Sequence, residues 1–311
     1  MKFTRREFFK TAFSGFVSLF LVKRKSFSKN LKIPYRKLNG IGKEVTVIGF
    51  GSTKRLTPDI VEYAIDSGIN YIDTAHSYQR GRSEEIIGKV MKKKRDRVFL
   101  VTKLDPASWR KKDQKKAFHE SLNESLKRLQ TDHVDAILAH NSNEVERFSR
   151  PELYEFFNEA KKQGKVSYLG LSFHRNWEEV LPEVLKHNEI QLILFPFWAA
   201  IDPKGYELLM AAHKKGIALV GMKAHRSFFN FHLDGWKESE YNEENPWRSK
   251  FSEKYELNAA KVALKFKEMS CLLVSMTTYD RVDKFILEAS KPYTGSFDKE
   301  AVPEHFKFIL E

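Results

Sequence analysis

Cysteine is almost absent from this chain of 311 residues, since Cys271 is the only one. A single cysteine excludes an intrachain disulfide, a cysteine-ligated iron–sulfur cluster and a cysteine-rich zinc site. Long apolar runs are missing as well, and none reaches the roughly 18 residues of an ordinary membrane-spanning helix. With 15 Gly, 10 Pro, 41% apolar and 31% charged residues, the composition also excludes collagen-like, low-complexity and wholly disordered chains.

Acidic residues are too few to balance the basic ones, and the formal net charge is +13 at pH 7. Residues 1–30 hold eight Lys or Arg and one acid, Glu7, so this short segment contributes +7 of the +13. The rest of the chain is only mildly basic, and it has no basic stripe or motif typical of nucleic-acid binders. We therefore expect no nucleic-acid partner.

The N-terminus has the layout of a signal peptide: a charged start, an apolar stretch from Thr11 to Val22 and a polar basic end. The apolar stretch is too short to span a bilayer at about 1.5 Å per residue. Arg5 and Arg6, followed by two Phe and a Lys, resemble a bacterial twin-arginine signal, which exports folded proteins. Residues 1–29 are therefore interpreted as the signal and residues 30–311 as the functional body.

This interpretation predicts the twin-arginine export machinery as a partner, a periplasmic or exported location, and membrane contact only through the signal segment. The small residues Ser26 and Ser28 offer a weak cleavage site before Lys29. An uncleaved signal would instead tether the protein to the membrane. An amphipathic N-terminal helix with a chance pair of arginines is the remaining alternative.

Short apolar runs alternate with amphipathic stretches along the body of the chain. Most of the runs are continuous rather than alternating, as in parallel strands covered on both faces. The predicted strands are Val45–Phe50, Tyr71–Thr74, Val98–Lys103, Val134–His140, Ser167–Phe173, Leu192–Phe197, Ala218–Lys223 and Cys271–Met276. The predicted helices are Pro58–Asp66, Ser83–Lys94, Lys112–Leu129, Pro151–Lys162, Trp177–Lys186, Gly205–Lys214, Asn258–Glu268 and Arg281–Ser290.

Eight strand–helix units in succession indicate parallel strands joined by right-handed crossovers. An open doubly wound sheet could hold them, but a closed (β/α)8 TIM barrel is the simpler α/β fold at this length. The segment Tyr35–Glu44, which contains Asn39-Gly40, predicts a β-hairpin before the first barrel strand. The long irregular stretch from Ala224 to about Glu256 follows strand seven, where a loop of this length is usually a lid or a binding loop.

Polar residues close several of the predicted strands, at the end of a barrel where catalytic groups gather. Asp73, Lys103 and His140 end strands two, three and four, which are neighbours, and Tyr78 lies in the loop after Asp73. An ammonium beside a phenol lowers the pKa of the phenol, so Tyr78 could give a proton to a developing alkoxide. Because side chains supply no hydride, this group of residues implies a nicotinamide cofactor.

Each of these residues also has an ordinary structural interpretation. An Asp at a strand end is often a helix cap, a Lys there can be a surface residue, and a His can be a satisfied core residue. Their occurrence together, at consecutive strand ends, favours a catalytic role. A lyase or isomerase on the same barrel would need a metal or paired carboxylates at the strand ends, and only Asp73 is present there. We therefore rank this class of enzyme last, and no metal site is predicted.

Four segments resemble aldo-keto reductases. Tyr71–Gly88, which reads YIDTAHSYQRGRSEEIIG, is similar to the signature segment of that family. The other three resemble its lysine segment, its histidine strand and its fifth-strand segment, in the right order: Val101–Lys103, Asp132–His140 and Gly164–Ser172. The similarity runs from about residue 35 to about residue 290.

The resemblance implies an NAD(P)H-dependent oxidoreductase that reduces an aldehyde or ketone to an alcohol on a TIM barrel. Tyr78 would be the general acid, tuned by Lys103 and Asp73, and His140 would orient the small-molecule carbonyl substrate. The same resemblance implies cofactor binding by Ser172 through the nicotinamide carboxamide, by Met222 against a ring and by Arg281 at a phosphate.

The cofactor side departs from the family pattern at several positions. Phe173 replaces a common Asn, Leu194 lies where an amide is usual, and Phe285 occupies an adenine-side Asn position. The retained Arg281 favours NADP(H) over NAD(H). The departures keep open a second function, namely an exported, non-catalytic module that binds a cofactor or a partner on the reductase scaffold.

Overall fold

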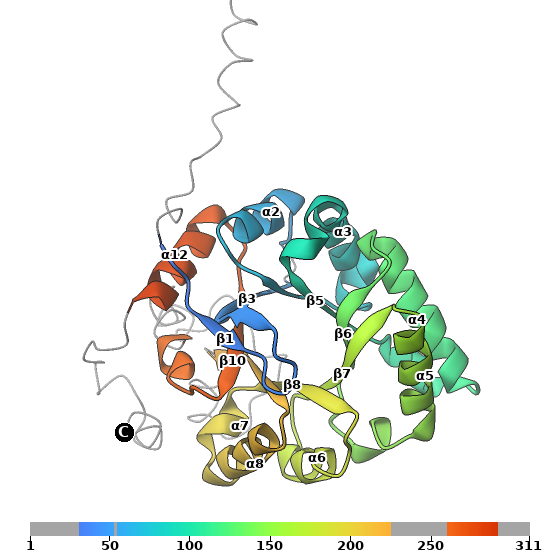
Figure 1. Cartoon of the computed structure of the whole chain (residues 1–311). Helices are drawn as coiled ribbons and strands as arrows, with labels where there is room; N and C mark the ends of the chain where they lie inside the picture. The colour runs from blue at the N-terminus through green and yellow to red at the C-terminus, as the bar shows by residue number, and fades with distance from the viewer. Residues whose placement is uncertain (1–30, 53–54, 225–259, 292–311) are drawn as a thin grey trace, which may run out of the picture.

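The computed structural model describes residues 31–52, 55–224 and 260–291. Within them, eight parallel strands close into a barrel in the order β10-β3-β4-β5-β6-β7-β8-β9, with helices around the outside (Figure 1). The strands are β3 (Ile48–Gly51), β4 (Tyr71–Asp73), β5 (Phe99–Lys103), β6 (Val134–Ala139), β7 (Val166–Ser172), β8 (Ile190–Pro196), β9 (Ala218–Met222) and β10 (Met269–Ser275). The predicted closed barrel is thus confirmed and the open sheet is not formed.

In the described residues the helices follow the strands as the sequence predicts: two have the predicted bounds, five have ends shifted by one or two residues, and one short helix was not predicted. They are α2 (Pro58–Asp66), α3 (Arg82–Lys94), α4 (Gln114–Leu129), α5 (Pro151–Lys162), α6 (Trp177–Val184), α7 (Trp198–Ile201), α8 (Pro203–Lys214) and α12 (Tyr279–Ser290). Short 3-10 turns lie between them: η2 (Tyr78–Gly81), η3 (Arg95–Arg97), η4 (Pro106–Arg110) and η5 (Val145–Arg147). Asp113, Asp202 and Thr278 cap α4, α8 and α12 with side-chain oxygens that accept backbone N–H bonds.

The first predicted strand, Val45–Phe50, was wrong in its extent. The structure divides it into β2 (Glu44–Thr46), which pairs antiparallel with β1 (Tyr35–Lys37), and the barrel strand β3. The division falls at Val47, whose N–H donates to the Pro34 carbonyl. An unbroken apolar run cannot reveal such a division, because both halves are buried.

The predicted N-terminal hairpin is therefore confirmed, and it closes the end of the barrel at which the strands begin. Its turn contains Gly40 at φ +64°, and a Cβ there would lie 1.9 Å from the Gly216 carbonyl oxygen just before β9. Ser270, at the start of β10, donates to the Lys37 carbonyl. The opposite end, where the strands stop, is left for the functional site.

The helical segment predicted over Asn258–Glu268 ends early, since only residues 260–264 of it are helical in the described chain. Arg36 of the hairpin explains this end. Its guanidinium donates to three main-chain carbonyls in succession, those of Leu264, Phe266 and Met269, at 2.6–2.9 Å. The bond to Leu264 satisfies a carbonyl that a helix continuing to Glu268 would have used itself.

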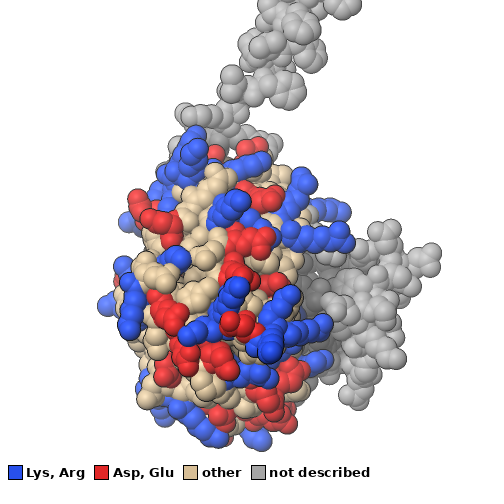
Figure 2. All heavy atoms as spheres, turned by 90° about the vertical axis from the view of Figure 1, so that its right-hand side faces the viewer, with Lys and Arg blue, Asp and Glu red and all other residues tan. Residues whose placement is uncertain are grey.

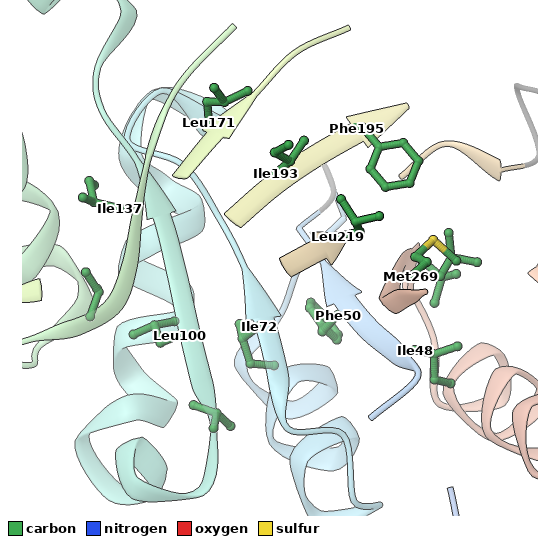
Figure 3. Close-up of a cluster of buried hydrophobic side chains, with 14 of the residues drawn as sticks. Ile48, Phe50, Ile72, Leu100, Ile137, Leu171, Ile193, Phe195, Leu219 and Met269 are labelled. Carbon is green, nitrogen blue, oxygen red and sulfur yellow. The ribbon is translucent and has the colours of Figure 1, made fainter. Parts of the chain in front are cut away.

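The core has two layers, because the strands are buried on both faces. Outward-facing side chains such as Ile72 and Leu100 pack under the helices, and Figure 3 shows part of this layer. The inward-facing layer fills the barrel itself, where the rings of Tyr71, Phe99 and Tyr168 stack with centroids 5.5 and 6.1 Å apart. Continuous apolar strands are the sequence counterpart of this double burial.

Acidic and basic side chains are interspersed on the face seen in Figure 2. Charged side chains of the described residues pair in many places, as Lys94 does with Asp66 and Arg95 with Asp135. None of the helices in the described ranges has the length and apolar character needed to cross a membrane. The predicted signal, residues 1–29, and the predicted loop after strand seven, except for Ala224, lie outside the described residues.

Candidate active site

Two neighbouring strands end in a buried ion pair. Asp73 is the last residue of β4 and Lys103 the last of β5, and these strands pair in parallel. The Lys103 ammonium donates to Asp73 Oδ1 at 2.6 Å and to the Thr74 carbonyl at 2.7 Å. Asp73 and Lys103 are 3% and 1% exposed, so water screens the pair little.

Tyr78 lies beside this pair on the turn η2, which joins β4 to α3. The Lys103 Nζ lies over the Tyr78 ring, 4.9 Å from its centroid. The ring of His140, which directly follows β6, meets the Tyr78 ring edge-on at a centroid distance of 5.8 Å. The strand order β4-β5-β6 therefore brings Asp73, Lys103, His140 and Tyr78 into one cluster.

Burial controls the ionisation of the cluster. Burial raises the pKa of Tyr78 above its ordinary value, and the Lys103 ammonium offsets only part of this. The sequence-based expectation of a lowered Tyr78 pKa therefore has the correct contribution from Lys103 but omits the larger one. Burial likewise raises the pKa of Asp73. For Lys103, burial lowers the pKa, but the contacts with Asp73 and Tyr78 together outweigh it and the pKa is raised.

His140 is neutral at physiological pH. It is 4% exposed, and burial together with the positive charges of Lys103, His174 and Arg147 lowers its pKa to about 2. Its Nδ1 atom is buried without a hydrogen-bond partner among the described residues. A neutral imidazole has one N–H and one acceptor nitrogen, so His140 can donate a hydrogen bond to a ligand oxygen.

The buried neutral state of His140 predicts an acid-sensitive fold. An unfolded His takes up a proton near pH 6.5 but the folded one does so near pH 2, so protons favour the unfolded state between these values. Below pH 6 the free energy of unfolding should fall by about 1.4 kcal/mol per pH unit more in the wild type than in His140→Gln. Urea titrations at pH 5.5 and 4.5 measure this difference, and equal slopes in both proteins would contradict it.

A cavity of about 340 Å³ begins at Asp73 and Tyr78 and runs past the ends of β9 and β10 to the start of α12. Met222 and Leu194 contribute apolar surface to its wall, and Arg281 and Phe285 line it at α12. Two of the three predicted cofactor residues, Met222 and Arg281, thus line the same cavity as Asp73 and Tyr78, whereas Lys103 and His140 are not among its lining residues.

Arg281 is held in place at the first turn of α12. Its Nε donates to the Ser275 carbonyl at 3.2 Å, and its guanidinium lies over the Phe285 ring, 5.5 Å from the centroid. Phe285, which departs from the family pattern, therefore stabilises the Arg281 guanidinium by a cation–π contact. The N–H groups of this helix start add partial positive charge to the same region.

Ser172, the third predicted cofactor residue, is not among the residues that line the cavity. It closes β7 and is 1% exposed. Its hydroxyl accepts a long hydrogen bond of 3.4 Å from the Asn141 N–H, and its carbonyl accepts from Ser142 at 2.7 Å. These contacts join the ends of β6 and β7.

Sequence reasoning did not select three polar residues that line the cavity, namely Ser52, Lys223 and Ser275. Ser52 and Lys223 directly follow β3 and β9, and Ser275 is the last residue of β10. The signal that selected Asp73 and Lys103, a polar residue where an apolar run stops, could have found them too.

The donor set of the cavity fits a dinucleotide. Arg281 provides a cation at the start of a helix, a position that suits a phosphate. Met222 offers a polarisable apolar surface to a ring. Asp73 and Tyr78 line the other end of the cavity. No group of three or more potential metal ligands of the His, Cys, Asp and Glu types occurs among the residues described.

Comparisons with known proteins agree with this arrangement. A model of the aldo/keto reductase family matches residues 50–284. The uncharacterized oxidoreductase YqkF of Bacillus subtilis (strain 168) is 32% identical over 196 residues, which cover 60% of this chain and 62% of that protein. The aldo-keto reductase YhdN of the same strain is 34% identical over 129 residues, covering 39% of this chain and 38% of that protein.

Among solved structures, the aldo-keto reductase AKR11C1 from Bacillus halodurans superposes with a TM-score of 0.67 at 22% identity. The match covers 89% of this chain and 96% of that one, and it supports the fold. The sequence matches to the two curated relatives span about two fifths to three fifths of those proteins' lengths. With its barrel, its strand-end cluster and a family match over three quarters of its length, the chain belongs to the aldo/keto reductase family.

Proposed function

We propose that this protein is an NAD(P)H-dependent carbonyl reductase with Tyr78 as its general acid. The observation that carries the proposal is a cluster that reaches the cavity through Asp73 and Tyr78, in which Tyr78 lies against the Lys103–Asp73 ion pair and the His140 ring. A reduced nicotinamide, when bound, supplies the hydride for the carbonyl carbon. The protein supplies the proton for the carbonyl oxygen and polarises the carbonyl group.

Each group in the cluster has a role that follows from its protonation state. The raised pKa keeps the Tyr78 hydroxyl protonated at neutral pH, so a proton is available for the carbonyl oxygen. The neutral His140 orients that oxygen through its N–H. The Lys103 ammonium stabilises the phenolate that Tyr78 becomes, and Asp73 holds the ammonium in place.

We further propose that Arg281 and Met222 bind the cofactor and that NADP(H) is preferred to NAD(H). Arg281 would pair with a phosphate at the start of α12, and Met222 would lie against a ring, while Ser172 at the end of β7 would reach the nicotinamide carboxamide. The small-molecule substrate is an aldehyde or a ketone.

A titration with nucleotides tests the proposal at its binding step. Tryptophan fluorescence of the wild type should report NADPH binding with micromolar or tighter affinity. Arg281→Ala should weaken NADPH binding about tenfold, and NADH binding much less, because it removes one charged phosphate contact. Lys284→Ala is the matched control, since Lys284 pairs with Asp280 on the outer side of the same helix.

The same titration can refute the proposed enzymatic activity. If the protein binds neither nucleotide and none copurifies with it, hydride transfer is rejected, and the non-catalytic binding module becomes the better explanation. An equal effect of Arg281→Ala and Lys284→Ala on NADPH binding would reject the phosphate role of Arg281.

We propose that residues 1–29 export the folded barrel by the twin-arginine route to the periplasm, with residues 30–311 as the functional body. Folded export would carry a cofactor acquired in the cytoplasm. Replacing Arg5 and Arg6 together by Lys should retain the protein in the cytoplasm. Replacing Lys23 and Arg24, beyond the apolar stretch, by Gln should not.

Cell fractionation with antibody detection measures this distribution and separates a tethered form, which would pellet with the membrane, from a released one. The same distribution for both double variants would show that the arginine pair is not an export signal.

A further inference from the structure

The turn that carries Tyr78 has an unusual backbone. Three residues after Tyr78 adopt left-handed conformations in succession, with φ of 52° at Gln79, 57° at Arg80 and 89° at Gly81. Left-handed backbone is unfavourable for residues with a side chain, and it persists where surrounding contacts hold it. The position of the proton donor therefore depends on whatever holds this turn.

Arg128, on the neighbouring helix α4, contacts the turn on both sides of Tyr78. Before Tyr78, its Nη1 donates to the His76 carbonyl at 3.2 Å. After Tyr78, its guanidinium packs against Gly81, where a Cβ would lie only 2.4 Å from the Arg128 Cζ. The glycine thus serves two needs, the positive φ and the close approach of the guanidinium.

Arg128 is itself fixed by two carboxylates. It forms an ion pair with Glu124 one turn earlier on α4 and meets Glu84 Oε2 at 3.4 Å. Glu84 is fully buried in the first turn of α3, and its other oxygen accepts from the Thr102 hydroxyl at 2.6 Å. Thr102 precedes Lys103 on β5, so this network joins the Tyr78 turn to the lysine strand.

We propose that Arg128 is a positioning residue for Tyr78, holding the left-handed turn against the Lys103 strand through Glu84 and Thr102. The proposal rests on the proposed role of Tyr78 as proton donor. Arg128 is not among the residues that line the cavity, so it acts through the turn and not by contact with a ligand. The position of Tyr78 thus depends on Arg128, which lies 50 positions later in the sequence.

The variant Arg128→Met tests the proposal, because Met fills much of the same space without the hydrogen bonds. We expect kcat for aldehyde reduction to fall about 10²-fold, the loss typical of a catalytic group displaced by about 1 Å. The KM for NADPH should stay within about twofold, because the Arg281 end of the cavity is untouched.

Arg95→Met is the matched control. Arg95 is also a partly buried arginine with two main-chain acceptors, Val98 and His133, and one carboxylate, Asp135. Arg95 lies on η3, just before β5 begins, at the opposite end of the barrel from Tyr78. The Arg95→Met variant should lose stability but keep the wild-type kcat. An equal loss of kcat in Arg95→Met and Arg128→Met would overturn the proposal.

A double variant guards against misfolding. Arg128→Met alone leaves the Glu84 carboxylate buried without its cation, whereas Glu84→Gln/Arg128→Met removes both charges and keeps a group for Thr102 to bond. The double variant should regain thermal stability but keep the low kcat, because the His76 and Gly81 contacts are still missing. Recovery of both properties together would show a purely structural role.

The positioning can also be measured without turnover. In protein labelled with carbon-13 at the tyrosine Cζ, the Tyr78 signal, assigned with Tyr78→Phe, should shift in Arg128→Met and not in Arg95→Met. If the wild type reduces no carbonyl, the proposed function fails, and this spectrum still decides the positioning. An unchanged Tyr78 signal in Arg128→Met would overturn it.

Discussion

Tyr78→Phe is expected to lower kcat for carbonyl reduction about 10³-fold, within the range that general acids contribute. The change removes one oxygen atom and leaves the ring against His140 and Lys103. His140 cannot replace the lost proton donor, because it is neutral and its pKa is about 2. The Lys103 ammonium is engaged by Asp73 Oδ1 and the Thr74 carbonyl. The KM for NADPH should be almost unchanged, since the variant loses an interaction of the reaction step alone.

Tyr154→Phe is the control for this variant. Tyr154 is partly buried on α5, and its hydroxyl donates to the Phe148 carbonyl at 2.5 Å. Its replacement also removes a tyrosine hydroxyl and one hydrogen bond, at a residue that does not line the cavity, and should leave kcat unchanged. Steady-state assays with NADPH and a simple aldehyde measure both variants, and a Tyr78→Phe protein with wild-type kcat would reject Tyr78 as the acid.

The barrel was predictable from the sequence because double burial leaves a direct trace. Strands such as Phe99–Lys103 are apolar at successive positions, and each is followed by a segment with helical periodicity. Element boundaries were less predictable, because they depend on contacts with distant segments. Arg36 ends the helical residues 260–264 from more than 220 positions away, and no local pattern in that segment announces it.

The catalytic candidates were predictable for a similar reason. Asp73, Lys103 and His140 interrupt apolar runs, and a closed barrel has to bring adjacent strand ends together. The direction of the Tyr78 pKa was not predictable, because it depends on how deeply the hydroxyl is buried, whereas the sequence shows only which charges are near. Ser172 shows the same limit, since its contact with the Asn141 N–H depends on a loop whose backbone is left-handed at Asn141.

Arg128 could not have been identified from the sequence. It follows Lys127 on a helix rich in basic residues, and a charged residue on an amphipathic helix is ordinarily a solvated one. Only the packing of α3 against α4 places its guanidinium on the Tyr78 turn. Groups that act through a second residue lack the strand-end position that marks the catalytic candidates.

Lys103→Met is expected to reduce both turnover and stability strongly. It removes the cation from a carboxylate that is 3% exposed, and breaking a buried ion pair from one side costs ~3–5 kcal/mol. Turnover should fall to near the level of Tyr78→Phe, because the phenolate formed during proton transfer loses its stabilising charge. Urea unfolding and the NADPH assay measure the two effects separately.

Lys94→Met is the matched control. Lys94 also forms carboxylate contacts, with Asp66 at 2.6 Å and Glu62 at 3.0 Å, but both acids are about half exposed. Its loss should cost no more than about 1 kcal/mol, because water stabilises the carboxylates that remain. An equal destabilisation by both variants would contradict the view that burial sets the strength of the Asp73–Lys103 pair.

A second variant separates the contribution of the pair to folding from its contribution to chemistry. Asp73→Asn/Lys103→Met removes both charges, and replacing a whole buried pair by neutral groups is often close to neutral for stability. The double variant should therefore recover most of the free energy of unfolding without recovering turnover. Return of turnover along with stability would mean that Lys103 serves the fold alone, and the proton donor would then owe its reactivity to burial and to the His140 side of the cluster.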